Sequence, residues 1–131
     1  MITMRNRLLL LAALVLTVLT VPARAQAPQA FAVLTSTTCP GSGCVQVPVG
    51  GLGHVGIQLN GTWVATAQFK GSIDGANFVA LSMVPSNSIT TATSATANGV
   101  WNANVGGYQV IQVSLSAFTS GAVVVNLQGA P

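Results

Sequence analysis

Beyond position 30 the chain consists largely of short runs in which apolar and polar residues alternate one for one. The clearest run, residues 63–70, has apolar side chains at every second position: Trp63, Ala65, Ala67 and Phe69. Successive side chains of a strand point to opposite faces, so a period of two predicts strands that each bury one face. No segment keeps a helical period for longer than a turn or two. The sequence therefore predicts an all-β protein.

Glycine, asparagine, serine and proline separate these runs and predict tight turns. Asn-Gly between two alternating runs is a strong hairpin signal, so we expect residues 55–59 and 63–70 to pair through Asn60-Gly61. Further hairpins are expected at three other turns: Cys39–Cys44, Asp74–Asn77 and Thr119–Gly121. The polar segment Ser86–Asn98 is predicted to be a long loop. About eight mostly antiparallel strands, each with one apolar face, imply two sheets packed as a jelly-roll or immunoglobulin-like sandwich.

The first 25 residues have the three parts of a secretory signal peptide. Arg5 and Arg7 precede an uncharged apolar run from Leu8 to Val21, and the small-residue site Ala23-Arg24-Ala25 follows it. The run of 14 residues is shorter than the roughly 20 needed to cross a bilayer, which argues against a retained anchor. We expect cleavage after Ala25 and export of residues 26–131, as a single domain without a membrane segment, to the periplasm, cell surface or medium.

Charged side chains are almost absent from residues 26–131, because three of the four cationic residues lie in the signal. Lys70, Asp74 and His54 remain. Nucleic-acid binding requires several Lys or Arg at phosphates, so this class of function is excluded. A nearly neutral surface also promotes association, which makes self-association a possible role.

The same scarcity argues against an enzyme, because general acid and base partners are missing. Gly51–Gly56 has the G-x-G-x-x-G spacing of a dinucleotide site, but that motif must open a helix, and here Asn60-Gly61 turns the chain between strands. A triad of His54, Asp74 and a serine lacks the G-x-S-x-G elbow. We therefore expect no catalysis, no cofactor and no metal.

Cys39 and Cys44 enclose a Pro-Gly-Ser-Gly turn. Export makes the compartment oxidising, so a disulfide between them is our main interpretation. Free thiols are one alternative. A metal site is another, and it would have to recruit His54 and Asp74, whose spacing does not favour it.

The outward strand faces are rich in Thr, Ser, Asn and Gln, which can hydrogen-bond a neutral ligand such as a sugar. Trp63 and Trp101 share faces with apolar residues and are predicted to be core. Tyr108 lies on the face opposite Ile111 and is the best candidate for an exposed aromatic. The candidate ligand-binding residues are Tyr108, Gln109, Gln112, Asn102 and Asn104.

Residues 61–128 resemble a family of small β-sandwich modules in phage and prophage virion proteins, including tail-fibre and receptor-binding components. The resemblance lies in GTWVATAQFKGSIDGANFVAL, ANGVWNANVGGYQVIQVSLSAFTSG and VVVNL. It implies a non-catalytic module for surface adhesion or particle architecture. The run from Tyr108 to Ser114 lacks the Arg common in that family, and a signal peptide favours a secreted relative over a virion part.

Two roles follow from these features. The first is a secreted module for adhesion that binds a neutral partner, such as a glycan, through its polar strands, Tyr108 and the Ser86–Asn98 loop. The alternative is a structural subunit that assembles with itself into a surface layer, filament or virion-like particle. For the alternative, the apolar last strand, Ala122–Leu127, has no charge or proline to block pairing at a sheet edge.

Overall fold

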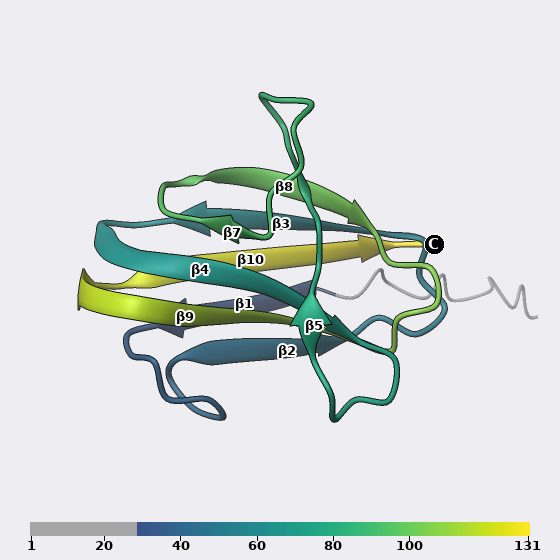
Figure 1. Ribbon diagram of the computed structural model, residues 1–131, viewed down its shortest axis with the longest axis horizontal. Coiled ribbons are helices and arrows are strands. Elements are labelled where there is room, and N and C mark those ends of the chain that lie inside the picture. The colour runs from purple at the N-terminus through teal and green to yellow at the C-terminus, as the bar shows by residue number, and fades with distance from the viewer. Residues whose placement is uncertain (1–28) are drawn as a thin grey trace, which may run out of the picture.

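The computed structural model describes residues 29–131, which form a two-layer antiparallel sandwich (Figure 1). Its strands are β1 (Gln29–Leu34), β2 (Cys44–Pro48), β3 (His54–Asn60), β4 (Trp63–Ser72), β5 (Val79–Ala80), β6 (Val84–Pro85), β7 (Ser94–Ala95), β8 (Gly99–Asn104), β9 (Val110–Gly121) and β10 (Val123–Ala130). The all-β sandwich is confirmed, with ten strands within this range instead of about eight. The predicted signal peptide, residues 1–25, lies outside the described residues.

One layer, sheet A, has the strand order β1-β10-β3-β8-β6. The other layer, sheet B, has the order β2-β9-β4-β5, with β7 also paired to β4. Nearly all of the core lies between the two sheets. It is built from the apolar residues at every second position of each strand. Buried side chains include Ile57, Leu59, Phe69, Ile111, Val113, Val123 and Val125. Phe69 of sheet B and Trp101 of sheet A meet across the core with ring centroids 5.5 Å apart.

Three of the expected hairpins are instead connections between the two sheets. The Asn60-Gly61 turn leads from β3 in sheet A to β4 in sheet B. Thr119–Gly121, expected to form a turn, are instead the last residues of β9 in sheet B, and the chain passes to β10 in sheet A at Ala122. The cysteine turn likewise separates β1 in sheet A from β2 in sheet B. The hairpin predictions at these turns were wrong because alternation and turn residues show where the chain reverses and do not specify its pairing partner.

The β3–β4 and β9–β10 turns pack against each other, and glycine is required at both. Gly61 has a φ of +109° and Gly121 a φ of +87°, values that side chains rarely tolerate. A Cβ on Gly61 would lie 2.5 Å from the carbonyl oxygen of Ala122. Asn98 holds the β3–β4 turn, since its Nδ2 donates to the Gly61 carbonyl at 2.9 Å and its Oδ1 accepts from Trp63 Nε1 at 2.7 Å. Trp63, predicted to be core, is half-buried here, whereas Trp101 is buried.

The hairpin at Asp74–Asn77 is confirmed, because β4 pairs with β5 in the register Lys70 to Ala80. Asp74 organises this turn: its Oδ1 accepts from the backbone N–H groups of Ala76 and Asn77 at 2.9 and 2.8 Å and from Ser72 Oγ at 2.9 Å. The hydrogen bonds from Asn77 have the largest effect, and together with those from Ala76 and Ser72 they hold the pKa of the Asp74 carboxyl well below its ordinary value. The carboxylate is therefore committed to the turn.

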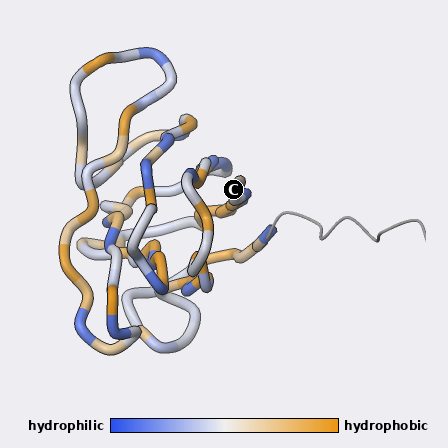
Figure 2. The backbone as a smooth tube through the Cα atoms, turned by 90° about the vertical axis from the view of Figure 1, so that its right-hand side faces the viewer, coloured by the Kyte–Doolittle hydropathy of each residue, from blue (hydrophilic) through white to orange (hydrophobic). Residues whose placement is uncertain are grey.

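The chain between residues 78 and 98 forms several short pieces. The two-residue strands β5 and β6 are separate, and the predicted loop Ser86–Asn98 contains β7, which pairs with β4. Between β6 and β7 the chain projects beyond the sandwich in both views (Figures 1 and 2), with Ile89 98% exposed. These two-residue strands account for the larger strand number.

The last strand is not at a sheet edge. β10 pairs with β1 on one side and β3 on the other, so the expectation that Ala122–Leu127 offers an open edge was wrong. Within the described residues, sheet A ends at β1 and β6 instead. Of these, β1 is the longer edge strand and carries two exposed apolar side chains, Phe31 and Val33.

Candidate functional site: the outer face of sheet A

The five predicted ligand-binding residues do not form one site. Asn102 and Asn104 lie on β8, on the outer face of sheet A. Tyr108 and Gln109 lie in the connection from β8 to β9, and Gln112 lies on β9 in sheet B. The structure brings only the two asparagines onto one surface, because neighbours along the chain change sheets between β8 and β9.

Gln112 is covered by the disulfide loop. Its side chain is 5% exposed, and its Nε2 donates to Cys39 Sγ at 3.0 Å. The predicted disulfide between Cys39 and Cys44 is present, with their Cα atoms 5.3 Å apart. Ser114, two residues further along β9 on the same face, is also buried, and within residues 29–131 its Oγ has no hydrogen-bond partner. Gln112 faces outward, as alternation requires, but the loop removes it from contact with a ligand.

Tyr108 is half-buried and packs on a glycine of the neighbouring strand. A Cβ at Gly71 of β4 would lie 2.6 Å from Tyr108 Cε1, so the ring occupies the space that a side chain would need. Gln109 is exposed, and its backbone N–H donates to the Ser72 carbonyl at 2.8 Å. Both residues therefore contact β4 just before β9 begins.

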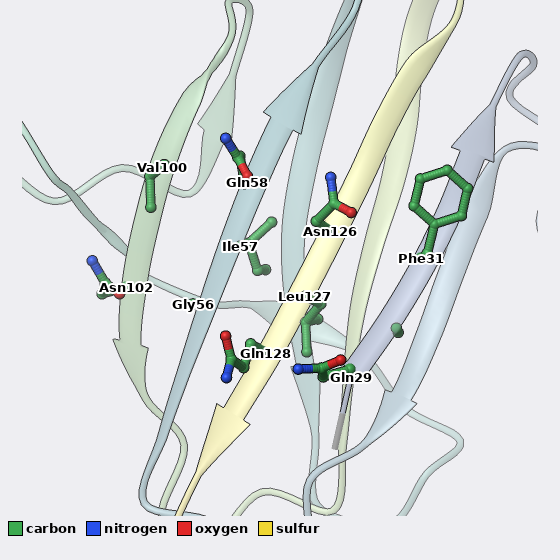
Figure 3. A pocket seen from close by; sticks show the side chains of 11 residues that line it. Gln29, Phe31, Gly56, Ile57, Gln58, Val100, Asn102, Asn126, Leu127 and Gln128 are labelled. Carbon is green, nitrogen blue, oxygen red and sulfur yellow. The ribbon is translucent and has the colours of Figure 1, made fainter. Parts of the chain in front are cut away.

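The outer face of sheet A contains an open hollow of about 710 Å³. Two rows of outward-facing residues cross β1, β10, β3 and β8 and line it (Figure 3). One row is Gln29, Gln128, Gly56 and Asn102. The neighbouring row is Phe31, Asn126, Gln58 and Val100. We call this hollow the amide groove, because five of these eight side chains are amides.

The amides of the groove have their hydrogen-bonding capacity available. Among the described residues, no hydrogen bond joins the side chain of Gln29, Gln58, Asn102, Asn126 or Gln128 to another protein group, whereas Asn77, Asn98 and Asn104 are engaged in this way. Each amide carries two donors and an acceptor oxygen with two lone pairs. The residues that line the groove include no ionisable side chain. The groove therefore offers many donors and acceptors and no charge.

Gly56 makes the hollow in the middle of the first row. Its neighbours across the sheet are Gln128 and Asn102, so a missing side chain leaves an open space between two amides. A Cβ there would meet only Asn102 Oδ1, at 3.3 Å, and the Gln128 carbonyl oxygen, at 4.0 Å. On the β1 side of the groove, Phe31 is 67% exposed. Its ring lies on β1, beside Asn126 of β10 (Figure 3). The groove thus combines a polar floor with one accessible aromatic ring.

A smaller hollow of about 250 Å³ continues the groove toward the C-terminal end of β10. It shares Gly56, Asn102 and Gln128 with the amide groove and adds His54 and Ala130. His54 is exposed and is the ionisable residue of the described part of sheet A. Asn104 pairs with His54 in register, but its Oδ1 is occupied by the N–H of Gly106 at 2.9 Å.

Neither a metal-binding cluster nor a membrane-spanning helix is found in residues 29–131. No cluster of three or more His, Cys, Asp or Glu side chains in this part of the chain is arranged to hold a metal ion. Over the same residues, no helix long and apolar enough to cross a membrane is present.

This fold is that of small β-sandwich modules found in prophage proteins. The SPBc2 prophage-derived protein YomS superposes with a TM-score of 0.60 at 13% sequence identity, over 79% of this chain and 96% of YomS. The PBSX exported protein XepA superposes with a TM-score of 0.64 at 19% identity, over 79% of this chain and 38% of XepA. The chain thus spans little more than a third of XepA.

No family model and no curated protein matches the sequence. The resemblance to phage and prophage modules that the sequence suggested is confirmed by these two structures at the level of the fold.

Sequence reasoning found Asn102 and missed the rest of the groove. Alternation does place Gln58, Asn126 and Gln128 on outward faces, so a signal existed on each strand. It could not be combined, because the order β1-β10-β3-β8 joins strands that are far apart in the chain. Phe31 was missed for a related reason: the expected first hairpin assigned its strand to the wrong neighbour.

Proposed function

We propose that the chain is an exported, non-catalytic binding module that engages a neutral, hydrogen-bonding partner on the outer face of sheet A. The observation that carries this proposal is the amide groove, with five unengaged amide side chains and no ionisable group in its lining. Buried polar groups need partners, so a surface of this kind favours a ligand rich in donors and acceptors. Adhesion to a cell or particle surface is the role that fits such a ligand.

The placement of the ionisable residues supports a role without catalysis. Asp74 holds the β4–β5 turn of sheet B through hydrogen bonds to Ser72, Ala76 and Asn77. His54 lies on the outer face of sheet A. Acid and base catalysis requires ionisable groups to act together on one substrate, and Asp74 and His54 lie on different sheets.

Three observations support export. The first 25 residues have the composition of a signal peptide. XepA, one of the two similar structures, is described as an exported protein. The Cys39–Cys44 disulfide is also typical of proteins that fold outside the cytoplasm.

Salt dependence tests the proposal directly. Labelled exported protein is incubated with bacterial envelopes from a panel of species, at low and at high sodium chloride concentration. Because the groove is uncharged, we expect the affinity to change less than about twofold. A loss of about tenfold or more at high salt would show ionic binding and refute the proposal. Absence of binding to every envelope would refute it as well.

A structural subunit is the second candidate, and the β1 edge favours it. Residues 29–34 contain no charge and no proline, and Phe31 and Val33 are 67% and 46% exposed. Such an edge can pair with a second chain. Sedimentation and light scattering over a hundredfold concentration range decide the question: a growing particle supports assembly, and a monomer throughout dismisses it.

A further inference from the structure

We infer that the ligand of the amide groove is a linear neutral glycan that lies across the strands, and that Gly56 is the position that admits it. This inference rests on the proposed binding function and adds the class of ligand, its direction and a specificity-determining residue. Three features of the groove carry it: the arrangement of the two rows, their chemistry, and the gap at Gly56.

The rows define a track perpendicular to the strands. Four neighbouring strands about 4.8 Å apart give a track roughly 14 Å long. Residues two apart on one strand are about 6.7 Å apart, so the two rows form parallel walls at that separation. Gln58 and Asn126 line one wall, and Gln128 and Asn102 the other. An extended chain of single sugar rings matches a shallow track of this length and width.

The chemistry of the walls matches hydroxyl groups. A hydroxyl both donates and accepts, as an amide does, so each sugar can satisfy amides on either side. The apolar face of a sugar ring stacks on aromatic rings, and Phe31 provides such a ring beside Asn126. An anionic polymer would find no cation in the groove to compensate its charge.

A peptide fits this surface less well. Extended peptides bind sheets at their edges, where backbone N–H and C=O groups are unpaired. The groove lies on the face of the sheet instead, and β10 and β3, which form its floor, have neighbours on both sides. On a face the peptide backbone would have to rely on side-chain amides alone.

Gly56 sets the depth of the track. Its side-chain position is the one gap between the amides of Gln128 and Asn102, and its φ is not in the left-handed region, so other residues can adopt its backbone conformation. Threonine at this position would fill the gap with three heavy atoms. Threonine is also favoured in strands, so the change should leave the fold intact.

The experiment compares matched variants on defined glycans. Exported wild-type protein and the variants Gly56→Thr and Gln58→Ala are titrated against cellulose, chitin, starch and mannan. Ala80→Thr on β5 and Gln46→Ala on β2 are the controls, because they make similar changes on exposed strand positions of sheet B. Thermal unfolding of every variant shows whether the fold is retained.

We expect the wild type to bind at least one of the four glycans, Gly56→Thr and Gln58→Ala to lose tenfold or more in affinity, and the controls to stay within twofold. Glycan binding that both groove variants leave unchanged would overturn the assignment of the site. Failure to bind any of the four glycans would overturn the class of ligand.

Treated envelopes separate a failure of this inference from a failure of the proposed function. Periodate opens sugar rings that carry two adjacent free hydroxyl groups, and protease removes proteins. Binding that is lost after periodate supports the glycan. Binding that survives periodate and is lost after protease overturns the glycan while the binding module stands, and no binding to untreated envelopes overturns both.

Discussion

The effect of Gly71→Ala on the free energy of unfolding should change sign when Tyr108 is removed. Gly71 is buried on β4, and its backbone is not in the left-handed region. Alanine at such a position stabilises by about 0.4–1 kcal/mol, because it restricts the unfolded chain. The three atoms nearest to the added Cβ all belong to Tyr108, and two of them, Cε1 and Cδ1, lie at 2.6 and 2.7 Å.

Carbon atoms in contact normally lie about 3.5–4.0 Å apart, so the ring must move by roughly 1 Å. Overpacking of this kind costs about 1–3 kcal/mol, which exceeds the entropic gain. We therefore expect Gly71→Ala to destabilise by about 1–2 kcal/mol. That corresponds to a melting temperature lower by about 4–16 °C for a domain of this size.

A double-mutant cycle tests this reasoning. In a Tyr108→Ala background the obstacle is gone, and the same Gly71→Ala change should stabilise by about 0.4–1 kcal/mol. Urea unfolding followed by circular dichroism measures all four proteins, with Gly56→Ala on β3 as a control, because its added Cβ comes no closer than 3.3 Å to Asn102 Oδ1 and 4.0 Å to the Gln128 carbonyl oxygen. If Gly71→Ala costs less than about 0.5 kcal/mol in the wild type, or costs the same in both backgrounds, Tyr108 does not pack as described.

Three other outcomes are expected. Replacing Cys39 and Cys44 by serine should lower stability by about 2 kcal/mol, as closure of a short loop predicts, and calorimetry should show a melting temperature lower by about 8–16 °C. Because hydrogen bonds lower the folded-state pKa of Asp74 from 3.8, its stabilising effect is present above that pH and is lost as the pH falls toward the folded-state value. Asp74 is the sole Asp or Glu of the sequence, so Asp74→Ala should flatten the acid limb of urea midpoints measured between about pH 5 and pH 2. Asn98→Ala removes the hydrogen bonds to Trp63 Nε1 and the Gly61 carbonyl and should cost about 0.5–1.5 kcal/mol in chemical denaturation, whereas an unchanged midpoint would contradict the role of Asn98 in holding the β3–β4 turn.

The faces of the strands were predictable from the sequence, and their partners were not. Parity correctly buries Ala67, Phe69, Ile111 and Val113, because side-chain direction along a strand depends on local geometry alone. Pairing depends on which sheet receives the next strand. A turn such as Asn60-Gly61 is compatible with a hairpin and with a connection between sheets, and only packing of the whole core selects the second.

In the candidate site too, the direction of a side chain was predictable from the sequence and its contacts were not. Gln112 faces outward, as predicted, but a loop from a different part of the chain places Cys39 over it. Tyr108 was expected to be exposed and lies half-buried on Gly71, because that glycine leaves room for its ring. Each of these outcomes depends on a contact between segments distant in sequence. Alternation within one strand carries no information about such contacts.

An uncharged groove can still discriminate between partners, through the cost of leaving its amides unsatisfied. A ligand that covers the groove removes water from five amide side chains, and each one left without a partner costs about 1–3 kcal/mol. An apolar partner would gain from contact with Phe31 but would leave most of these groups unpaired. A ligand rich in hydroxyl groups recovers the lost hydrogen bonds and keeps the aromatic contact. Specificity of this kind arises from rejection of poorly matched ligands, so the affinity of the correct one should be modest and insensitive to salt.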